Sequence, residues 1–84
     1  MSDLQSLKNI GPELERKLTS VGISTAEELK SIGSEEAYFR MKLTYPSVCL
    51  VYLQALEGAV SDTAYNKLPE DVMKRLKAFS DNLK

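Results

Sequence analysis

One seven-residue stretch occurs twice in the first half of the chain, and it decides how the fold is interpreted. Residues 7–13 read Leu-Lys-Asn-Ile-Gly-Pro-Glu and residues 29–35 read Leu-Lys-Ser-Ile-Gly-Ser-Glu, so five of seven positions are identical at an offset of 22 residues. Each copy has apolar residues that end one helix, a glycine for a turn, and a glutamate suited to the first turn of another helix. This repeat predicts two helix-turn-helix units packed as a pseudo-symmetric pair.

The two glycines, Gly11 and Gly33, stand where the chain would reverse, and a positive φ is least costly for glycine. The N–H groups that open the next helix would then point outward, toward any anion that approaches. In a helix-hairpin-helix motif such groups hold a DNA phosphate without reading the base sequence. Lys8 and Lys30 precede the two turns at equivalent positions. The plainer interpretation, which we favour, is that the repeat is a compact joint between short helices.

The charges around the repeat do not favour nucleic acid. Residues 1–36 carry four bases and seven acids, a net charge of −3, and the remaining 48 residues have a net charge of +2. Phosphate binding depends on the opposite balance. In addition, Asn9 and Ser31 replace the first glycine of the usual Gly-hydrophobic-Gly turn, and Pro12 has no amide proton to donate.

Turn signals divide the chain into helical segments, and strand patterns are nearly absent. We therefore predict an all-α fold of five to six short helices: a tandem helix-hairpin-helix-like (SAM-domain-like) unit, a buried central helix and a C-terminal amphipathic helix. The expected helices cover residues 3–8, 12–21, 26–32, 35–43, 48–60 and the segment after Pro69. The expected helix-end residues are Gly22 at a left-handed position, the pair Thr25 and Glu28 as a capping box, and Ser34 and Ser47 as N-caps.

Two groups of side chains offer further candidates. Lys74, Arg75 and Lys77 form a local cluster of bases on the last helix; this is a solvated face or, alternatively, part of a footprint for DNA or an acidic protein. Tyr45, beside a proline in a turn, is the best candidate for an exposed aromatic contact.

The central helix carries one carboxylate whose surroundings the sequence leaves open. Glu57 either forms a buried ion pair with Arg40 or Lys67, or faces solvent. The adjacent Gly58 is expected to permit close helix packing rather than to bind a ligand.

Composition bounds the function. With 84 residues, of which 43% are apolar, the chain has room for one core, and we expect a single complete domain over residues 1–84. Histidine is absent and Cys49 is the only cysteine, expected to be a small buried hydrophobe. We therefore predict no catalytic residue, no cofactor and no metal site. No segment approaches the roughly 20 apolar residues that cross a bilayer, and no secretory signal is visible, so we expect a cytoplasmic protein.

A series of motifs runs along nearly the whole chain. It comprises Leu4, Leu7 and Ile10-Gly11-Pro12, then Leu18, Val21-Gly22-Ile23-Ser24-Thr25, Ile32-Gly33, Ala37-Tyr38, Leu53-x-Ala55-Leu56-Glu57-Gly58-Ala59-Val60 and Leu68-Pro69. This series resembles the C-terminal domain of the TfoX competence-regulator family. The resemblance implies a helix-hairpin-helix-like fold and a link to bacterial regulation of natural competence, without established catalytic residues. Tyr65 stands where the family often has tryptophan, and we expect it in the core.

Two functions follow as hypotheses. The leading one is a non-catalytic, regulatory interaction module, not an enzyme, that binds a protein partner or itself. The alternative is weak, sequence-independent DNA binding through the two turns, with Lys8, Gly11, Lys30 and Gly33 as the contacts. Neither a membrane nor a metal is an expected partner.

Overall fold

The computed structural model describes residues 3–83, and it contains helices and turns but no strand within that range. The elements are η1 (Leu4–Ser6), α1 (Pro12–Ser20), α2 (Ala26–Thr44), α3 (Leu50–Ser61), η2 (Tyr65–Lys67) and α4 (Glu70–Asn82), where η marks a turn of 3-10 helix. The predicted all-α class is confirmed. The predicted number of helices is confirmed only in part, because residues 4–6 form a single 3-10 turn and the expected helices 26–32 and 35–43 are joined in α2.

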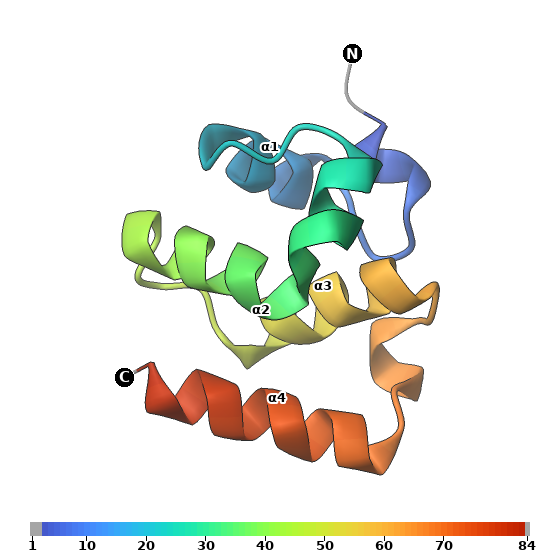
Figure 1. Ribbon diagram of the computed structural model, residues 1–84, viewed down its shortest axis with the longest axis vertical. Helices are drawn as coiled ribbons and strands as arrows, with labels where there is room; N and C mark the ends of the chain where they lie inside the picture. Colours follow the sequence, from blue (N-terminus) through green and yellow to red (C-terminus); the bar gives the residue numbers. More distant parts are fainter. Residues whose placement is uncertain (1–2, 84) are drawn as a thin grey trace.

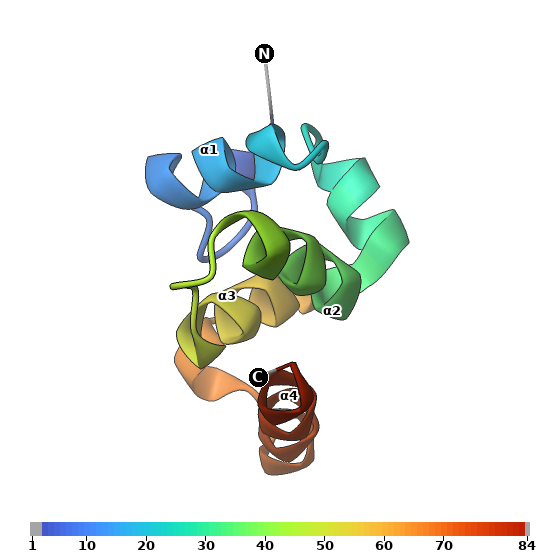
Figure 2. The same cartoon turned by 90° about the vertical axis from the view of Figure 1, so that its left-hand side faces the viewer.

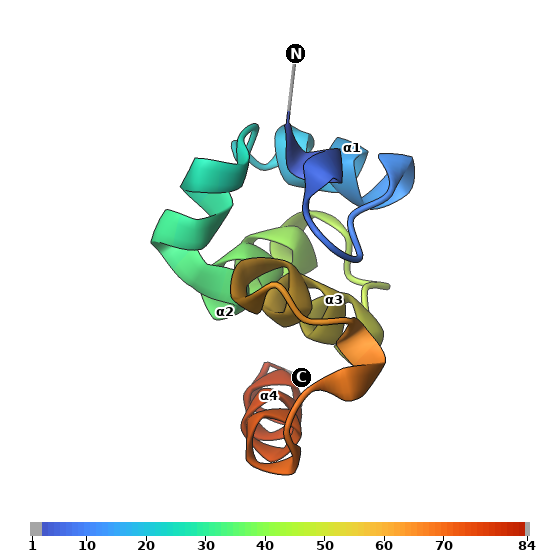
Figure 3. The ribbon, with the colours of Figure 1, turned by 90° about the vertical axis from the view of Figure 1, so that its right-hand side faces the viewer.

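The helices form three tiers along the longest dimension of the molecule, whose extents are 34 × 25 × 20 Å (Figures 1 and 2). η1 and α1 make one end, α3 and the second half of α2 make the middle, and α4 makes the other end. The first half of α2 runs from the α1 tier down to the middle tier, on the left in Figure 3. α3 packs against α2, η2 and α4, which places it at the centre.

The core is built from apolar side chains that every element except η2 contributes. Its buried members are Leu4, Ile10, Leu14, Leu18, Ile23, Leu29, Ala37, Tyr38, Met41, Val48, Leu53, Leu56, Ala59 and Leu76. α4 supplies only Leu76 to this set, while its Val72 and Phe79 are half-buried against the core. The helix at the C-terminal end of the fold is therefore attached by a narrow apolar stripe, as its amphipathic sequence predicts.

α2 begins with a well-satisfied N-terminus and contains one break. Thr25 Oγ1 accepts a hydrogen bond from the Glu28 N–H at 3.1 Å, as the capping box predicts, and Asp3 Oδ1 accepts one from the Ala26 N–H at 2.7 Å. The break is at Gly33, whose φ of 85° and ψ of 164° are non-helical. The expected cap of the second half, Ser34, is used differently, because its hydroxyl donates to Glu57.

α3 starts two residues later than the sequence predicts. Its N-cap is Cys49, without a side-chain hydrogen bond, so the prediction that Ser47 caps this helix is wrong. The reason lies in the preceding turn, where the Lys42 ammonium donates to the carbonyls of Pro46 and Val48 at 2.9 and 2.8 Å. These carbonyls accept hydrogen bonds from the lysine. The side chain of Val48, which precedes the helix, is only 1% exposed and packs in the core.

Candidate functional site

The first copy of the repeat forms the loop between η1 and α1. The positive φ of this loop belongs to Asn9, at 70°, while Gly11 is extended, with a φ of −100°. The prediction that Gly11 supplies a left-handed turn is therefore wrong. Asparagine tolerates this conformation better than most residues because its short polar side chain can form local hydrogen bonds. Pro12 follows at the start of α1, where its missing N–H carries no cost.

Asn9 also ties this loop to the opposite side of the fold. Its Nδ2 donates to the carbonyls of Ala55 and Thr63 at 3.3 and 3.0 Å, and its Oδ1 accepts from the Tyr65 N–H at 3.1 Å. A Cβ at Gly58 would collide with Asn9 Nδ2 and the Thr63 carbonyl. The glycine thus accommodates the asparagine and the following loop, whereas the sequence suggests helix-on-helix packing there.

The second copy of the repeat lies inside α2. Gly33 carries the positive φ, as predicted, and Ser34 behind it is 4% exposed. Ser34 Oγ donates to Glu57 Oε1 at 2.6 Å, and Arg75 Nη2 lies 3.1 Å from the same oxygen. The Glu57 side chain is 17% exposed and forms an ion pair, but the pair is only half-buried, and its partner comes from α4 and not from the predicted Arg40 or Lys67.

Lys8 and Lys30, the two predicted phosphate contacts, are both exposed. Within residues 3–83 neither ammonium group has a carboxylate within ion-pair distance. The backbone conformation next to the two lysines differs, however. The first turn has its positive φ at Asn9 and the second has it at Gly33. Identical sequence positions therefore do not present the same arrangement of amide groups.

The basic cluster on α4 is neutralised by its neighbours. Lys74 Nζ lies 3.3 Å from a Glu70 oxygen, and Lys77 Nζ lies 3.2 Å from an Asp81 oxygen. Arg75 faces Glu57, as described, with Glu35 at 3.7 Å from its Nε. Exposed pairs of this kind contribute little to stability, but they cancel the local charge. The cluster is a solvated face of alternating sign with one arginine anchored in the fold.

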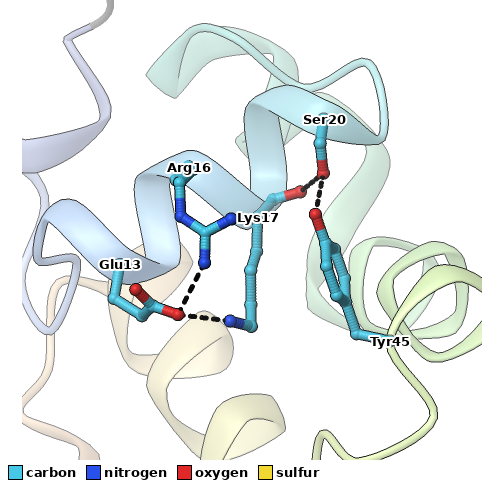
Figure 4. A network of polar contacts seen from close by, with 5 residues as sticks. All are labelled: Glu13, Arg16, Lys17, Ser20 and Tyr45. Atoms are coloured by element: carbon cyan, nitrogen blue, oxygen red, sulfur yellow. Dashed lines mark hydrogen bonds and ion pairs between the residues drawn. The ribbon is translucent and has the colours of Figure 1, made fainter.

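Tyr45 is not the free aromatic side chain that the sequence suggests. Figure 4 shows its hydroxyl against Ser20 Oγ, at 2.7 Å, and the Lys17 ammonium lies 5.1 Å from the centre of its ring. Lys17 in turn donates to Glu13, as does Arg16 at 2.8 Å. The hydrogen bond from Lys17, followed by that from Arg16, lowers the pKa of Glu13. This network fastens the turn after α2 to α1.

An uncharged surface surrounds the connection between α2 and α3. Residues 43–56 contain no acid or base, the longest such run in the chain. Leu43 and Val51 are 70% and 55% exposed, and they stand on the two sides of the connection. We define the uncharged apex as the exposed residues of this segment: Leu43, Thr44, Pro46, Ser47, Cys49 and Val51.

The observed exposures correct two sequence-based expectations, one on the apex and one elsewhere. Cys49 is exposed and not a buried hydrophobe, because it caps α3 instead of lying within it. The uncharged run itself was a visible signal, but an apolar segment is ordinarily interpreted as core. At the far side of α3, Tyr65 is 44% exposed, so its predicted place in the core is also wrong.

Two cavities flank the kink at Gly33, with volumes of 270 and 260 Å³. The first contains Glu28, whose pKa is lowered by hydrogen bonds from Ser24 and then from Thr25. The second contains the Glu57 cluster. The carboxylates of Glu28 and Glu57 thus accept hydrogen bonds from within the chain. Across residues 3–83, no group of three or more potential metal ligands comes together. Nor does any helix in this range have the length and apolarity to span a bilayer.

The fold and its polar clusters define a small all-helical domain organised around two glycine-containing turns. The profile of the TfoX C-terminal domain family matches residues 1–80. The chain belongs to this family.

Two solved structures resemble the fold closely. One is the crystal structure of an uncharacterized protein from Listeria monocytogenes in a triclinic form, with 44% identity, a TM-score of 0.93 and coverage of 95% of this chain and 91% of that one. Another, a protein of unknown function from the same organism in a tetragonal form, has 43% identity and a TM-score of 0.95 and covers 98% of this chain and 100% of that one. The comparison with curated proteins gives no significant match.

Proposed function

We propose that this chain is a cytoplasmic, non-catalytic and regulatory interaction module that binds another protein chain through the uncharged apex. The observation that carries the proposal is the exposure of Leu43 and Val51, at 70% and 55%, on the longest uncharged run of the sequence. Large apolar side chains that stay exposed on a small folded domain are candidates for a binding site.

The apex is held in one conformation, which favours binding. Its backbone is fixed from inside by the Lys42 ammonium on the Pro46 and Val48 carbonyls and by the burial of Val48. Tyr45 fastens the same segment to α1. A surface that is already ordered loses little conformational entropy when a partner binds.

The remaining polar groups support a module without catalytic chemistry. The carboxylates of Glu13, Glu28 and Glu57 are engaged by hydrogen-bond donors from the chain itself. The chain has no histidine to act as a general base.

Site-specific photo-crosslinking in living cells tests the proposal. A photoreactive residue at Leu43 is expected to give a defined cross-linked product, identified by mass spectrometry, because this side chain lies on the apex. The matched control carries the same residue at Tyr65, which is also exposed but lies on η2. Absence of any product at Leu43, or equal products at both positions, would argue against the apex as the binding surface.

DNA binding is the second candidate, and the exposed ammonium groups of Lys8 and Lys30 favour it. Fluorescence anisotropy with a labelled duplex is the test. Two phosphate contacts predict an affinity that falls with salt with a logarithmic slope of roughly −2. The double variant Lys8→Glu, Lys30→Glu would lose this binding, whereas the matched variant Lys74→Glu, Lys77→Glu would keep most of it. No binding at low salt would exclude this function.

A further inference from the structure

The attachment of α4 to the rest of the fold is slight compared with that of the helix it packs against. α3 buries four of its 12 residues, whereas α4 buries one of its 13, Leu76. Figure 3 shows α4, in red, at one end of the molecule, with α3 between it and α1. Segments with few buried contacts open at a lower free energy than the core of a domain. α4 is thus the helix that is most easily released.

Arg75 supplies a charged contact from α4 to the two helices beside it. Its Nη2 lies 3.1 Å from Glu57 Oε1 on α3, and its Nε lies 3.7 Å from a Glu35 oxygen on α2. Lys74, by contrast, pairs with Glu70 inside α4 itself, so that pair does not hold the helix in place. The charge of Arg75 therefore contributes to docking, and the charge of Lys74 does not.

Glu57 requires this arginine because its carboxylate is largely withdrawn from water. Its side chain is 17% exposed, and its Oε1 accepts a hydrogen bond from Ser34 Oγ at 2.6 Å in addition to the contact with Arg75. A carboxylate withdrawn from water is costly when no cation accompanies it. The docking of α4 and the neutralisation of Glu57 are therefore coupled. The Glu57 cluster comprises Ser34, Glu35, Glu57 and Arg75.

We infer that α4 is a releasable helix, which leaves α3 as one unit when the contacts of Arg75 in the Glu57 cluster break. The hinge lies between Tyr65, whose N–H is fixed by Asn9 Oδ1 at 3.1 Å, and the start of α4, where Leu68 is extended. Release uncovers Tyr38, which is 1% exposed and whose hydroxyl lies 3.3 Å from Ser80 Oγ on α4. This opening depends neither on the apex nor on a partner bound there.

The Glu57 cluster makes the release sensitive to ionic strength. The Arg75 side chain is 52% exposed, so dissolved ions reach the guanidinium and screen its attraction to the two carboxylates. The buried contacts of Leu76 are apolar and are not screened in this way. Added sodium chloride therefore shifts α4 toward the released state.

Native-state hydrogen exchange of the whole chain, followed by NMR, tests the inference. A helix of 13 residues is marginal in water by itself, so the amides of residues 74–82 are expected to exchange whenever α4 is released. They are expected to share one protection factor, lower than that of the buried part of α3. Arg75→Gln is expected to lower this factor about tenfold. Lys74→Gln, the matched control on the adjacent residue, is expected to lower it less than about twofold.

A change in the body of the fold separates release from global unfolding. Thr25 caps α2, and its hydrogen bond with the Glu28 N–H persists when α4 leaves. Thr25→Ala is therefore expected to lower the protection of α3 about fivefold and to leave that of α4 unchanged. Raising sodium chloride from about 20 mM to about 0.5 M is expected to lower the protection of α4, and Arg75→Gln is expected to abolish this dependence.

Three results would overturn the inference. Equal losses of protection in α3 and α4 on Thr25→Ala would show that α4 opens only when the whole domain unfolds. Protection that falls steadily from residue 74 to residue 82 would show fraying of a helix end and not release of a unit. An Arg75→Gln variant that behaves like Lys74→Gln would show that the Glu57 cluster does not hold α4. Each result leaves the proposed role of the apex untouched, because the apex and the cluster share no residue.

Discussion

The two copies of the repeated stretch share five of seven residues, yet they adopt different backbones. In the first, the left-handed residue is Asn9 and the glycine is extended; in the second, the glycine itself is left-handed and interrupts a helix. The shared residues therefore do not determine the turn. The two positions that differ, Asn9 against Ser31 and Pro12 against Ser34, decide it.

The physical cause is what each differing side chain binds. Asn9 finds three backbone partners in residues 55–65, which fix it in a left-handed conformation. Ser31, its counterpart, is exposed. The Ser34 hydroxyl donates a hydrogen bond to the Glu57 carboxylate, whereas its counterpart Pro12 has neither a hydroxyl nor an N–H that could donate one. The first turn is therefore stabilised by a side chain before its glycine, and the second by a side chain after it.

Removal of the Asn9 side chain is expected to have the largest effect. Asn9→Ala eliminates three hydrogen bonds and leaves a residue with a φ of 70° that alanine disfavours. We expect a loss of about 3 kcal/mol of unfolding free energy, from about 1 kcal/mol for each of two or three hydrogen bonds together with the backbone strain. Urea denaturation measures it. The counterpart Ser31→Ala is expected to change stability by less than about 0.5 kcal/mol; equal losses would show that the two turns are equivalent after all.

Substitution of Gly58 by alanine tests the contact of Asn9 with α3, because the sign of the stability change depends on that contact. In an ordinary helix interior, glycine to alanine stabilises by up to about 1 kcal/mol. Here the new Cβ collides with Asn9 Nδ2 and with the Thr63 carbonyl, so Gly58→Ala is expected to cost about 2 kcal/mol. Thermal unfolding followed by circular dichroism measures the change. A stabilised variant would contradict the close approach of Asn9.

The two shared glycines are expected to respond differently to alanine. Gly33→Ala forces a side chain into a φ of 85° and is expected to cost about 1 to 2 kcal/mol. Gly11→Ala is expected to change stability by less than about 0.5 kcal/mol, because its φ is −100° and nothing lies within 4 Å of the new Cβ. Parallel urea titrations of the two variants provide the comparison. If Gly11→Ala lowered the unfolding free energy as much as Gly33→Ala, the two turns would be equivalent and the proposed difference would be wrong.

Acidification is expected to have the smallest effect and to act on the first copy through Glu13. Hydrogen bonds from Lys17 and then Arg16 lower its pKa in the folded state. Its contribution to stability is therefore present above the unfolded pKa of about 4.3 and is lost as the pH falls through the lower folded value. The measurement is unfolding free energy against pH, in which Glu13→Gln should reduce the slope below pH 5 or so. An identical slope in the variant would mean that this exposed network contributes nothing measurable.

How far the sequence predicts the candidate site depends on the type of residue. Gly33, Pro12 and Thr25 behave as predicted because their roles are local: φ freedom, a missing N–H and an N-cap act within a few residues of the backbone. Cys49 and Tyr65 were misplaced because exposure depends on what packs above a side chain. The uncharged apex was missed for the same reason.

The sequence by itself determined the all-α class, the family and the positions of the main breaks. Helix periodicity, capping and turn chemistry are encoded within a few neighbouring residues, so they can be recognised without the fold. Only the tertiary structure decided which residue of each turn is left-handed, which base pairs with Glu57, and which apolar side chains remain in water. These outcomes depend on contacts between residues far apart in the chain, from 18 positions for Glu57 with Arg75 to 56 positions for Asn9 with Tyr65, and the energy of such contacts exists only once the helices have packed.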